Sequence, residues 1–176
     1  MPHAIEPASS GRAKCRGCGK AIAKGELRFG ERRDNPYAEG GEMTLWFHLV
    51  CGAYKRPEAM LEALDGAGEG LERKGWLADE ARRGLAHRRL PRVDGAERAS
   101  SGRATCRSCR GKIPQGEWRI RLGVLDEGGM PAPLGFLHAG CAREYFGTGE
   151  VLARVEHFTP ELTDAERAEL GQALAG

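Results

Sequence analysis

The stretch SGRAKCRGCGKAIAKGELRF at residues 10–29 recurs at residues 101–120 as SGRATCRSCRGKIPQGEWRI, with 11 of 20 positions identical. In each copy a Cys-x2-Cys pair is separated by 29 or 28 residues from a His-x2-Cys pair, and the two copies use all six cysteines of the chain. Three thiolates and one imidazole are the ligand set of a closed, tetrahedral, structural zinc site. The sequence therefore predicts two zinc ions, held by Cys15, Cys18, His48 and Cys51 and by Cys106, Cys109, His138 and Cys141.

Two other uses of these cysteines are weaker alternatives. Six cysteines in a small chain can form three disulfides, but disulfides leave the recurring histidines unexplained. Residues 1–15 also lack the apolar core that is typical of a secretory signal peptide. A catalytic zinc keeps one coordination position open for water, whereas each pattern here offers four protein ligands. Both observations favour structural zinc.

The repetition within 176 residues predicts two small units. Units of this size bury little apolar surface and commonly need a metal to stabilise the fold. The first unit is predicted at residues 1–90 and the second at residues 101–176. Residues 91–100, PRVDGAERAS, combine Pro, Gly and charge without periodicity, and are predicted to be a linker.

Each unit is predicted to be a small α+β fold, with a short antiparallel sheet and one or two helices after it. Alternation such as Trp118-Arg119-Ile120 is typical of a half-buried strand and places the arginines on the solvent face. Strands leading to the histidines are predicted at residues 43–48 and 134–138, with Trp46 and Phe136 in the core. Helices are predicted at residues 51–55, 77–85, 141–146 and 162–170, the last of them with a capping box at Thr163-x2-Glu166.

Positive charge is concentrated around the Cys-x2-Cys pairs, although the net charge is only +2. Residues 10–34 carry eight basic and three acidic side chains, and residues 98–121 carry seven and one. Residues 73–92 carry seven basic and two acidic side chains, whereas residues 122–176 carry three and nine. Basic clusters attract polyanions, above all nucleic acid. A merely solvated surface is the alternative for each cluster alone, but the recurrence in both repeats favours nucleic acid.

No apolar run approaches the ~20 residues that a membrane-spanning helix needs. Thiolate ligands stay reduced inside cells, so an intracellular location is expected. For a nucleic-acid-binding protein this means the cytoplasm or nucleoid of a bacterium, or the nucleus of a eukaryote.

The repeats resemble the poly(ADP-ribose) polymerase-type (PARP-type) zinc finger. The resemblance rests on Gly-Arg-x2-Cys-x2-Cys, an Ile-x2-Gly turn, a strand with a central arginine, and the long insertion before an aromatic-containing His-x2-Cys. It covers both repeats and so most of the chain. Fingers of this family sense DNA breaks, and one occurs in a nick-sealing DNA ligase. The best-known members also carry a large ADP-ribosyl transferase domain, for which the present sequence is too short.

The resemblance implies which residues contact DNA. The Gly-Arg arginines, Arg12 and Arg103, and the strand arginines, Arg28 and Arg119, are implied as phosphate contacts. Apolar residues before each histidine are expected to stack on bases exposed at a break, namely Tyr37 and Met43, and Met130 and Leu134. Packing of these apolar residues onto their own finger is the alternative. Further basic candidates for DNA binding are Lys14, Arg16, Arg107 and Arg121.

The sequence is thus interpreted as a zinc-dependent, sequence-independent DNA-binding protein and not an enzyme. Broken, ended or single-stranded DNA is its expected partner, because phosphate contacts give affinity without sequence information. A zinc-stabilised adaptor whose basic faces bind an acidic protein is the alternative. A nucleic-acid-processing enzyme is disfavoured, since the sequence shows no second kind of metal site and no carboxylate cluster.

Overall fold

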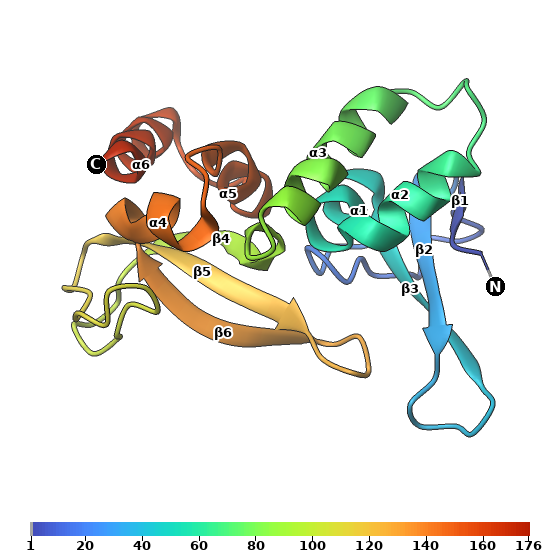
Figure 1. The fold of residues 1–176 in the computed structure, drawn as a ribbon, viewed down its shortest axis with the longest axis horizontal. Helices are drawn as coiled ribbons and strands as arrows, with labels where there is room; N and C mark the ends of the chain where they lie inside the picture. Colours follow the sequence, from blue (N-terminus) through green and yellow to red (C-terminus); the bar gives the residue numbers. More distant parts are fainter. Residues whose placement is uncertain (1) are drawn as a thin grey trace. The chain divides into compact units, whose positions relative to one another are not determined.

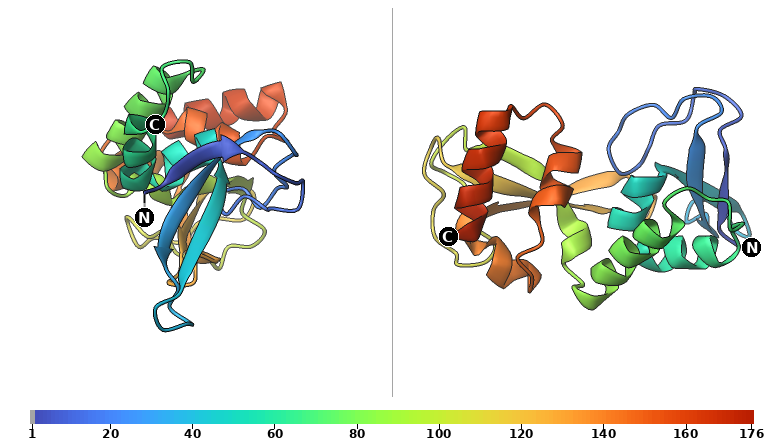
Figure 2. Two further views of the ribbon diagram at one scale, coloured as in Figure 1. Left: turned by 90° about the vertical axis from the view of Figure 1, so that its right-hand side faces the viewer. Right: turned by 90° about the horizontal axis from the view of Figure 1, so that it is seen from above.

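The computed structural model describes residues 2–176 and divides the chain into two compact units. One unit comprises the residues up to Ala86 together with Leu125–Pro131, and the other comprises His87–Val124 and Ala132–Gly176. Each sheet has three strands, in the orders β1-β2-β3 and β4-β5-β6, and helices accompany both (Figures 1 and 2). The predicted small α+β fold is confirmed.

In the first unit, antiparallel strands form a sheet that is covered by helices on one face. The elements are β1 (Ala4–Pro7), β2 (Leu27–Asp34), β3 (Glu42–His48), α1 (Leu49–Lys55), α2 (Pro57–Asp65) and α3 (Lys74–Ala86). Phe29 on β2 lies opposite Phe47 on β3, and both side chains are buried. Helix α1 packs on these strands, and α3 packs on α1 and α2. The core of this unit therefore lies between the sheet and its helices.

The second unit repeats this order with shorter helices. Its elements are a 3-10 turn η1 (Leu90–Arg92), β4 (Val93–Arg98), β5 (Trp118–Leu125), β6 (Pro131–His138), a 3-10 turn η2 (Ala139–Cys141), α4 (Ala142–Phe146), α5 (Leu152–Phe158) and α6 (Asp164–Ala175). Ile120 and Leu137 are buried in its core. The predicted capping box is present, because Thr163 accepts from the backbone N–H of Glu166 and the Glu166 carboxylate accepts from that of Thr163. Hydrogen bonds from the backbone N–H and the hydroxyl of Thr163 lower the pKa of the Glu166 carboxyl.

The prediction of a linker at residues 91–100 was wrong. Residues Val93–Arg98 form β4, which pairs antiparallel with β5. Its counterpart β1 in the first unit was also missed. Both are short strands whose pairing partner lies some twenty residues away in the sequence, so local periodicity carries little of their signal. Strands β1 and β4 determine which side chains lie beside Arg28 on β2 and Arg119 on β5.

The other predicted elements lie close to those observed. Helix α1 begins two residues earlier than predicted, at Leu49, and α3 begins at Lys74 rather than at residue 77. Cys141 closes the turn η2 instead of opening a helix. Helices α2 and α5 were not foreseen; α2 begins at Pro57, a residue that suits the first helical position because its missing N–H has no intrahelical acceptor there.

Candidate metal centres and nucleic-acid interface

The first metal centre joins three segments of the first unit. Cys15 and Cys18 lie in the turn before β2, His48 ends β3, and Cys51 lies in α1. The four ligand atoms lie within 4.8 Å of one another. Cys18 Sγ is 3.3 Å from His48 Nδ1, and the backbone N–H of His48 donates to Cys15 Sγ at 3.3 Å. Sulfur atoms bound tetrahedrally at ~2.3 Å are about 3.8 Å apart, so this spacing suits one zinc ion.

The second centre has the same construction in the second unit. Its four ligand atoms also lie within 4.8 Å of one another. His138 Nδ1 is 3.3 Å from Cys109 Sγ and 3.8 Å from Cys141 Sγ. The backbone N–H of His138 donates to Cys106 Sγ at 3.3 Å, as that of His48 does in the first centre. The two centres are thus copies in hydrogen bonding as well as in ligand order.

The outer nitrogen of each histidine shows which ring atom faces the thiols. His138 Nε2 lies 2.9 Å from the backbone carbonyl oxygen of Lys112, to which it can donate only in the tautomer that leaves Nδ1 free. His48 Nε2 lies 3.8 Å from the Glu26 carboxylate. Such outer partners fix the orientation of metal-ligating histidines. The residues at both centres therefore fit zinc, with Nδ1 as the ligand atom of each imidazole. The protein holds two zinc ions, one at each centre.

The short distances between the thiols also favour a bound metal ion at each centre. All six cysteines are free, so the disulfide alternative does not hold. Burial and the neighbouring Cys106 raise the pKa of the Cys141 thiol to about 12. Burial opposes ionisation of Cys106 as well, but hydrogen bonds from the backbone N–H groups of Cys109, His138 and Ser108 outweigh it and lower the pKa of that thiol to about 7. A divalent cation removes the mutual repulsion of such neighbouring thiolates, since they bind metal in the deprotonated form.

The strand arginines lie elsewhere than the sequence predicts. Arg28 on β2 is only 7% exposed. Its guanidinium stacks 3.5 Å from the ring centre of Trp46 and donates to the Glu6 carboxylate at 3.0 Å. The prediction of a solvent face was wrong because β1 places Glu6 directly opposite Arg28. Trp46 is half-buried and supplies a surface for the arginine, so its assignment to the apolar core was also wrong.

The second unit repeats this arrangement residue by residue. Arg119 is 7% exposed, stacks 3.7 Å from the ring centre of Phe136, and donates to Glu97 on β4 at 2.6 and 3.0 Å. Phe136, like Trp46, is half-buried rather than part of the core. Arg121 donates to the carbonyl oxygen of Asp94 at 3.1 and 3.3 Å, so it is held against β4. The carboxylates of Glu6 and Glu97 are functional neighbours that sequence reasoning missed.

We expect the buried and the exposed arginines to respond differently to replacement. Arg28→Ala should lower the free energy of unfolding by about 2 kcal/mol, because a stacked guanidinium and a charge-assisted hydrogen bond are lost. Arg12→Ala should change it by less than about 0.5 kcal/mol, since Arg12 is exposed. Urea unfolding of the zinc-loaded variants measures both. Equal stability of the two variants would contradict the structural role of Arg28.

The remaining basic candidates lie around the Cys-x2-Cys turns. Exposed members of this group are Arg12, Lys14, Arg103 and Arg107, while Arg16 is half-buried. Ser10 and Ser101 accept from the backbone N–H groups of Arg12 and Arg103, both at 3.4 Å. Sequence reasoning used these serines only as part of the repeat. These hydrogen bonds hold the same turn before each Cys-x2-Cys pair. The backbone of Arg12 and that of Arg103 are therefore held in the same way in the two repeats.

The apolar loop residues divide into two groups. Tyr37 lies in the loop between β2 and β3 and is 79% exposed, and Met130 ends the loop between β5 and β6 and is 51% exposed. Met43 and Leu134 instead lie within β3 and β6 and are half-buried. The alternative that all four pack onto their own finger therefore does not apply to Tyr37 and Met130.

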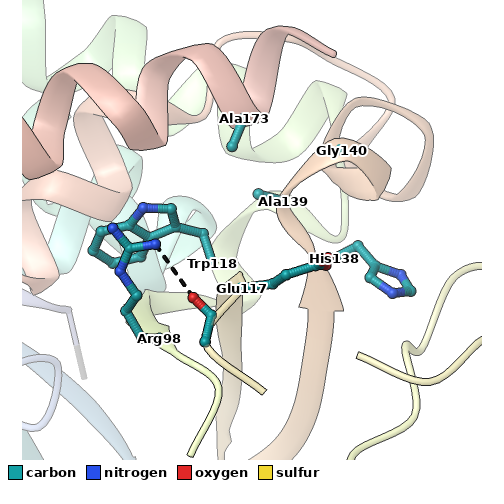
Figure 3. A pocket seen from close by; sticks show the side chains of 8 residues that line it. Arg98, Glu117, Trp118, His138, Ala139, Gly140 and Ala173 are labelled. Atoms are coloured by element: carbon teal, nitrogen blue, oxygen red, sulfur yellow. Dashed lines mark hydrogen bonds between the residues drawn. The ribbon is translucent and has the colours of Figure 1, made fainter. Parts of the chain in front are cut away.

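A pocket of about 320 Å³ adjoins the second centre (Figure 3). Arg98, Trp118 and Ala173 line it, and the ring of His138 points away from it. Arg98 pairs with Glu169 and also donates to the carbonyl oxygen of Gly116 at 3.2 Å. His138 is the one metal ligand that borders the pocket, with its ring turned away from it, and the Arg98 cation in the lining is already engaged.

Comparison with known proteins agrees with this geometry. The family described as "Poly(ADP-ribose) polymerase and DNA-Ligase Zn-finger region" matches residues 6–86. Poly [ADP-ribose] polymerase 1 of Gallus gallus is 32% identical over 181 residues, which cover 83% of this chain and 17% of that protein. Poly [ADP-ribose] polymerase of Sarcophaga peregrina is 31% identical over 144 residues, which cover 72% of this chain and 14% of that protein. The chain spans less than a fifth of the length of these relatives.

Two duplicated Cys3His centres, each between a three-stranded sheet and a helix or 3-10 turn, define a tandem zinc-finger protein. The matched region and the relatives, together with the repeat, show the particular kind of finger. The chain belongs to the PARP-type zinc finger family. None of the helices in the described part of the chain is long and apolar enough to cross a membrane.

Proposed function

We propose that this chain binds DNA at interruptions of the duplex, without reading its sequence. The observation that carries the proposal is the exposed Tyr37 in the β2–β3 loop, with exposed Met130 in the corresponding β5–β6 loop of the second repeat. An aromatic ring and a flexible thioether at loop tips offer apolar surface that a ligand can cover. Base faces become available where stacking is interrupted, and they accept aromatic and apolar contacts from any sequence.

Phosphate contacts are proposed for the exposed basic side chains beside the two Cys-x2-Cys turns, Arg12, Lys14, Arg103 and Arg107. They occur at equivalent places or close by in the two units, and the zinc centres hold the turns that carry them. Such contacts supply affinity and its salt dependence, whereas stacking supplies the preference for disrupted DNA. Arg28, Arg119 and Arg121 are proposed to support these surfaces from beneath, because they are engaged by β1 and β4 carboxylates or carbonyls.

Tyr37→Ala tests the stacking part of the proposal. We expect this variant to bind nicked or single-stranded DNA about 5- to 100-fold more weakly, since one base–aromatic contact contributes roughly 1–3 kcal/mol. Affinity for covalently closed circular duplex should hardly change. Fluorescence anisotropy with nicked and intact duplexes, together with closed circles as competitors, measures the difference. Equal affinity of the unaltered protein for closed circles and for broken DNA would refute the preference.

Salt dependence separates this function from that of an adaptor. Binding to unrelated DNA sequences should weaken steeply with salt, and Arg12→Ala should lower the slope by about one. Failure to retain DNA at about 100 mM salt would favour an adaptor that binds an acidic protein. We further propose that these residues act by binding rather than by catalysis, and that the protein works where cellular DNA is found, in the nucleoid or the nucleus.

A further inference from the structure

The two metal centres differ in how far their thiols are protected from solvent. We infer that the second centre is an oxidant-reactive site, in which peroxide modifies Cys109 and a disulfide with Cys141 follows, while the first centre persists. This inference goes beyond DNA binding and does not depend on it. It concerns the four ligands of the second centre and the order in which the two centres lose their metal.

Exposure is the first observation. Cys109 is exposed, whereas Cys18 at the same position of the first centre is half-buried. Cys141 is half-buried, whereas its counterpart Cys51 is buried at 1% exposure. Cys51 lies within α1, which packs against α2 and α3, while Cys141 ends the short 3-10 turn η2, which packs against α4 and α6. Two thiols of the second centre are therefore more accessible to solvent than their counterparts in the first centre. The third, Cys106, is buried like its counterpart Cys15.

The surroundings of Cys109 are the second observation. Exposed Arg107 and Arg110 flank it in the sequence. Reactive cysteines occur in electropositive, partly exposed places. Arg110 also adopts φ +66°, a conformation that the first centre gives to Gly19 at φ +75°. A side chain in this left-handed region is strained, so the turn that carries Cys109 is held less favourably than its counterpart.

The chemistry balances with hydrogen peroxide as the two-electron oxidant. The Cys109 thiolate attacks one peroxide oxygen, the O–O bond breaks, and sulfenic acid and hydroxide form. The Cys141 thiolate then attacks Cys109 Sγ, and the S–O bond breaks to give the disulfide and a second hydroxide. Two protons convert both hydroxides to water, and the oxidised centre would keep only Cys106 and His138 of its four ligands to hold zinc. The ligand atoms of the two cysteines are within 4.8 Å, so the second step requires little movement.

The test follows zinc release from the full chain loaded with two zinc ions. Hydrogen peroxide is added in the presence of a metallochromic indicator, and thiols are mapped by alkylation and mass spectrometry at intervals. We expect one ion to leave roughly tenfold faster than the other, as site-selective oxidation of exposed thiolates requires. The peptide that carries Cys109 and the one that carries Cys141 should lose alkylation first. Simultaneous release of both ions, or earlier loss of Cys18 and Cys51, would overturn the inference.

Matched variants assign the fast phase to one residue. Cys109→His and Cys18→His each leave two thiolates and two imidazoles, a set that still binds zinc. Cys18→His should keep the fast phase of release, and Cys109→His should slow it to the rate of the first centre. A fast phase that survives unchanged in Cys109→His contradicts the assignment. The thiol map of the unaltered protein decides the question even if a variant binds zinc poorly.

Discussion

Removal of both zinc ions is expected to unfold the parts of each unit that surround the centres. Structural zinc contributes on the order of 10–16 kcal/mol to small folds, which equals or exceeds the usual net stability of a whole domain, about 5–15 kcal/mol. In each unit the ligands join the turn before a strand, the end of the next strand, and the helix or turn after it. Circular dichroism and near-ultraviolet spectra during chelator titration should show this loss, and added zinc should restore the signal.

Replacement of one ligand should confine the loss to one unit. Cys18→Ala leaves three ligands in the first centre and all four in the second, because each centre is closed within its own repeat. Metal analysis of this variant should give one tightly bound zinc ion per chain in place of two. Amide exchange should accelerate around β2, β3 and α1 and change little around β5 and β6. Cys109→Ala should give the reciprocal pattern, and loss of both ions from either variant would contradict independent centres.

A second large effect is expected from Arg56→Ala. Glu31 on β2 is buried, with a side chain only 8% exposed, and Arg56 between α1 and α2 donates to both of its carboxylate oxygens, one of them at 2.6 Å. Removing the arginine leaves a buried carboxylate without its cation, which costs about 3–5 kcal/mol. The variant should therefore unfold at much lower urea concentration than the unaltered protein, with both loaded with zinc.

Arg82→Ala is the matched control for this prediction. Arg82 on α3 donates to Asp79 at 3.1 Å, but both side chains are well exposed. An exposed ion pair contributes only about 0–1 kcal/mol, so this variant should unfold close to the unaltered protein. Restoration of most of the stability by the double replacement of Arg56 with Met and Glu31 with Gln would show that the unpaired charge, and not lost packing, causes the effect.

The sequence by itself determined the parts of this protein that depend on local spacing. The Cys-x2-Cys and His-x2-Cys motifs identify the metal ligands directly, because a tetrahedral site needs four donors and each repeat supplies the same four residue types. Apolar alternation marked the strands β2 and β5, and the Thr163-x2-Glu166 pattern marked the start of α6, since these signals extend over only a few neighbouring residues. The small α+β fold followed from them.

Tertiary structure alone decided what the basic side chains can reach. Arg12 and Arg28 are equally basic in sequence, yet Arg12 is exposed, and Arg28 is buried against Trp46 and Glu6. The difference arises from β1, whose pairing with β2 is a long-range contact that local periodicity does not encode. Exposure depends on which distant elements pack over a residue, and identical motifs cannot show that.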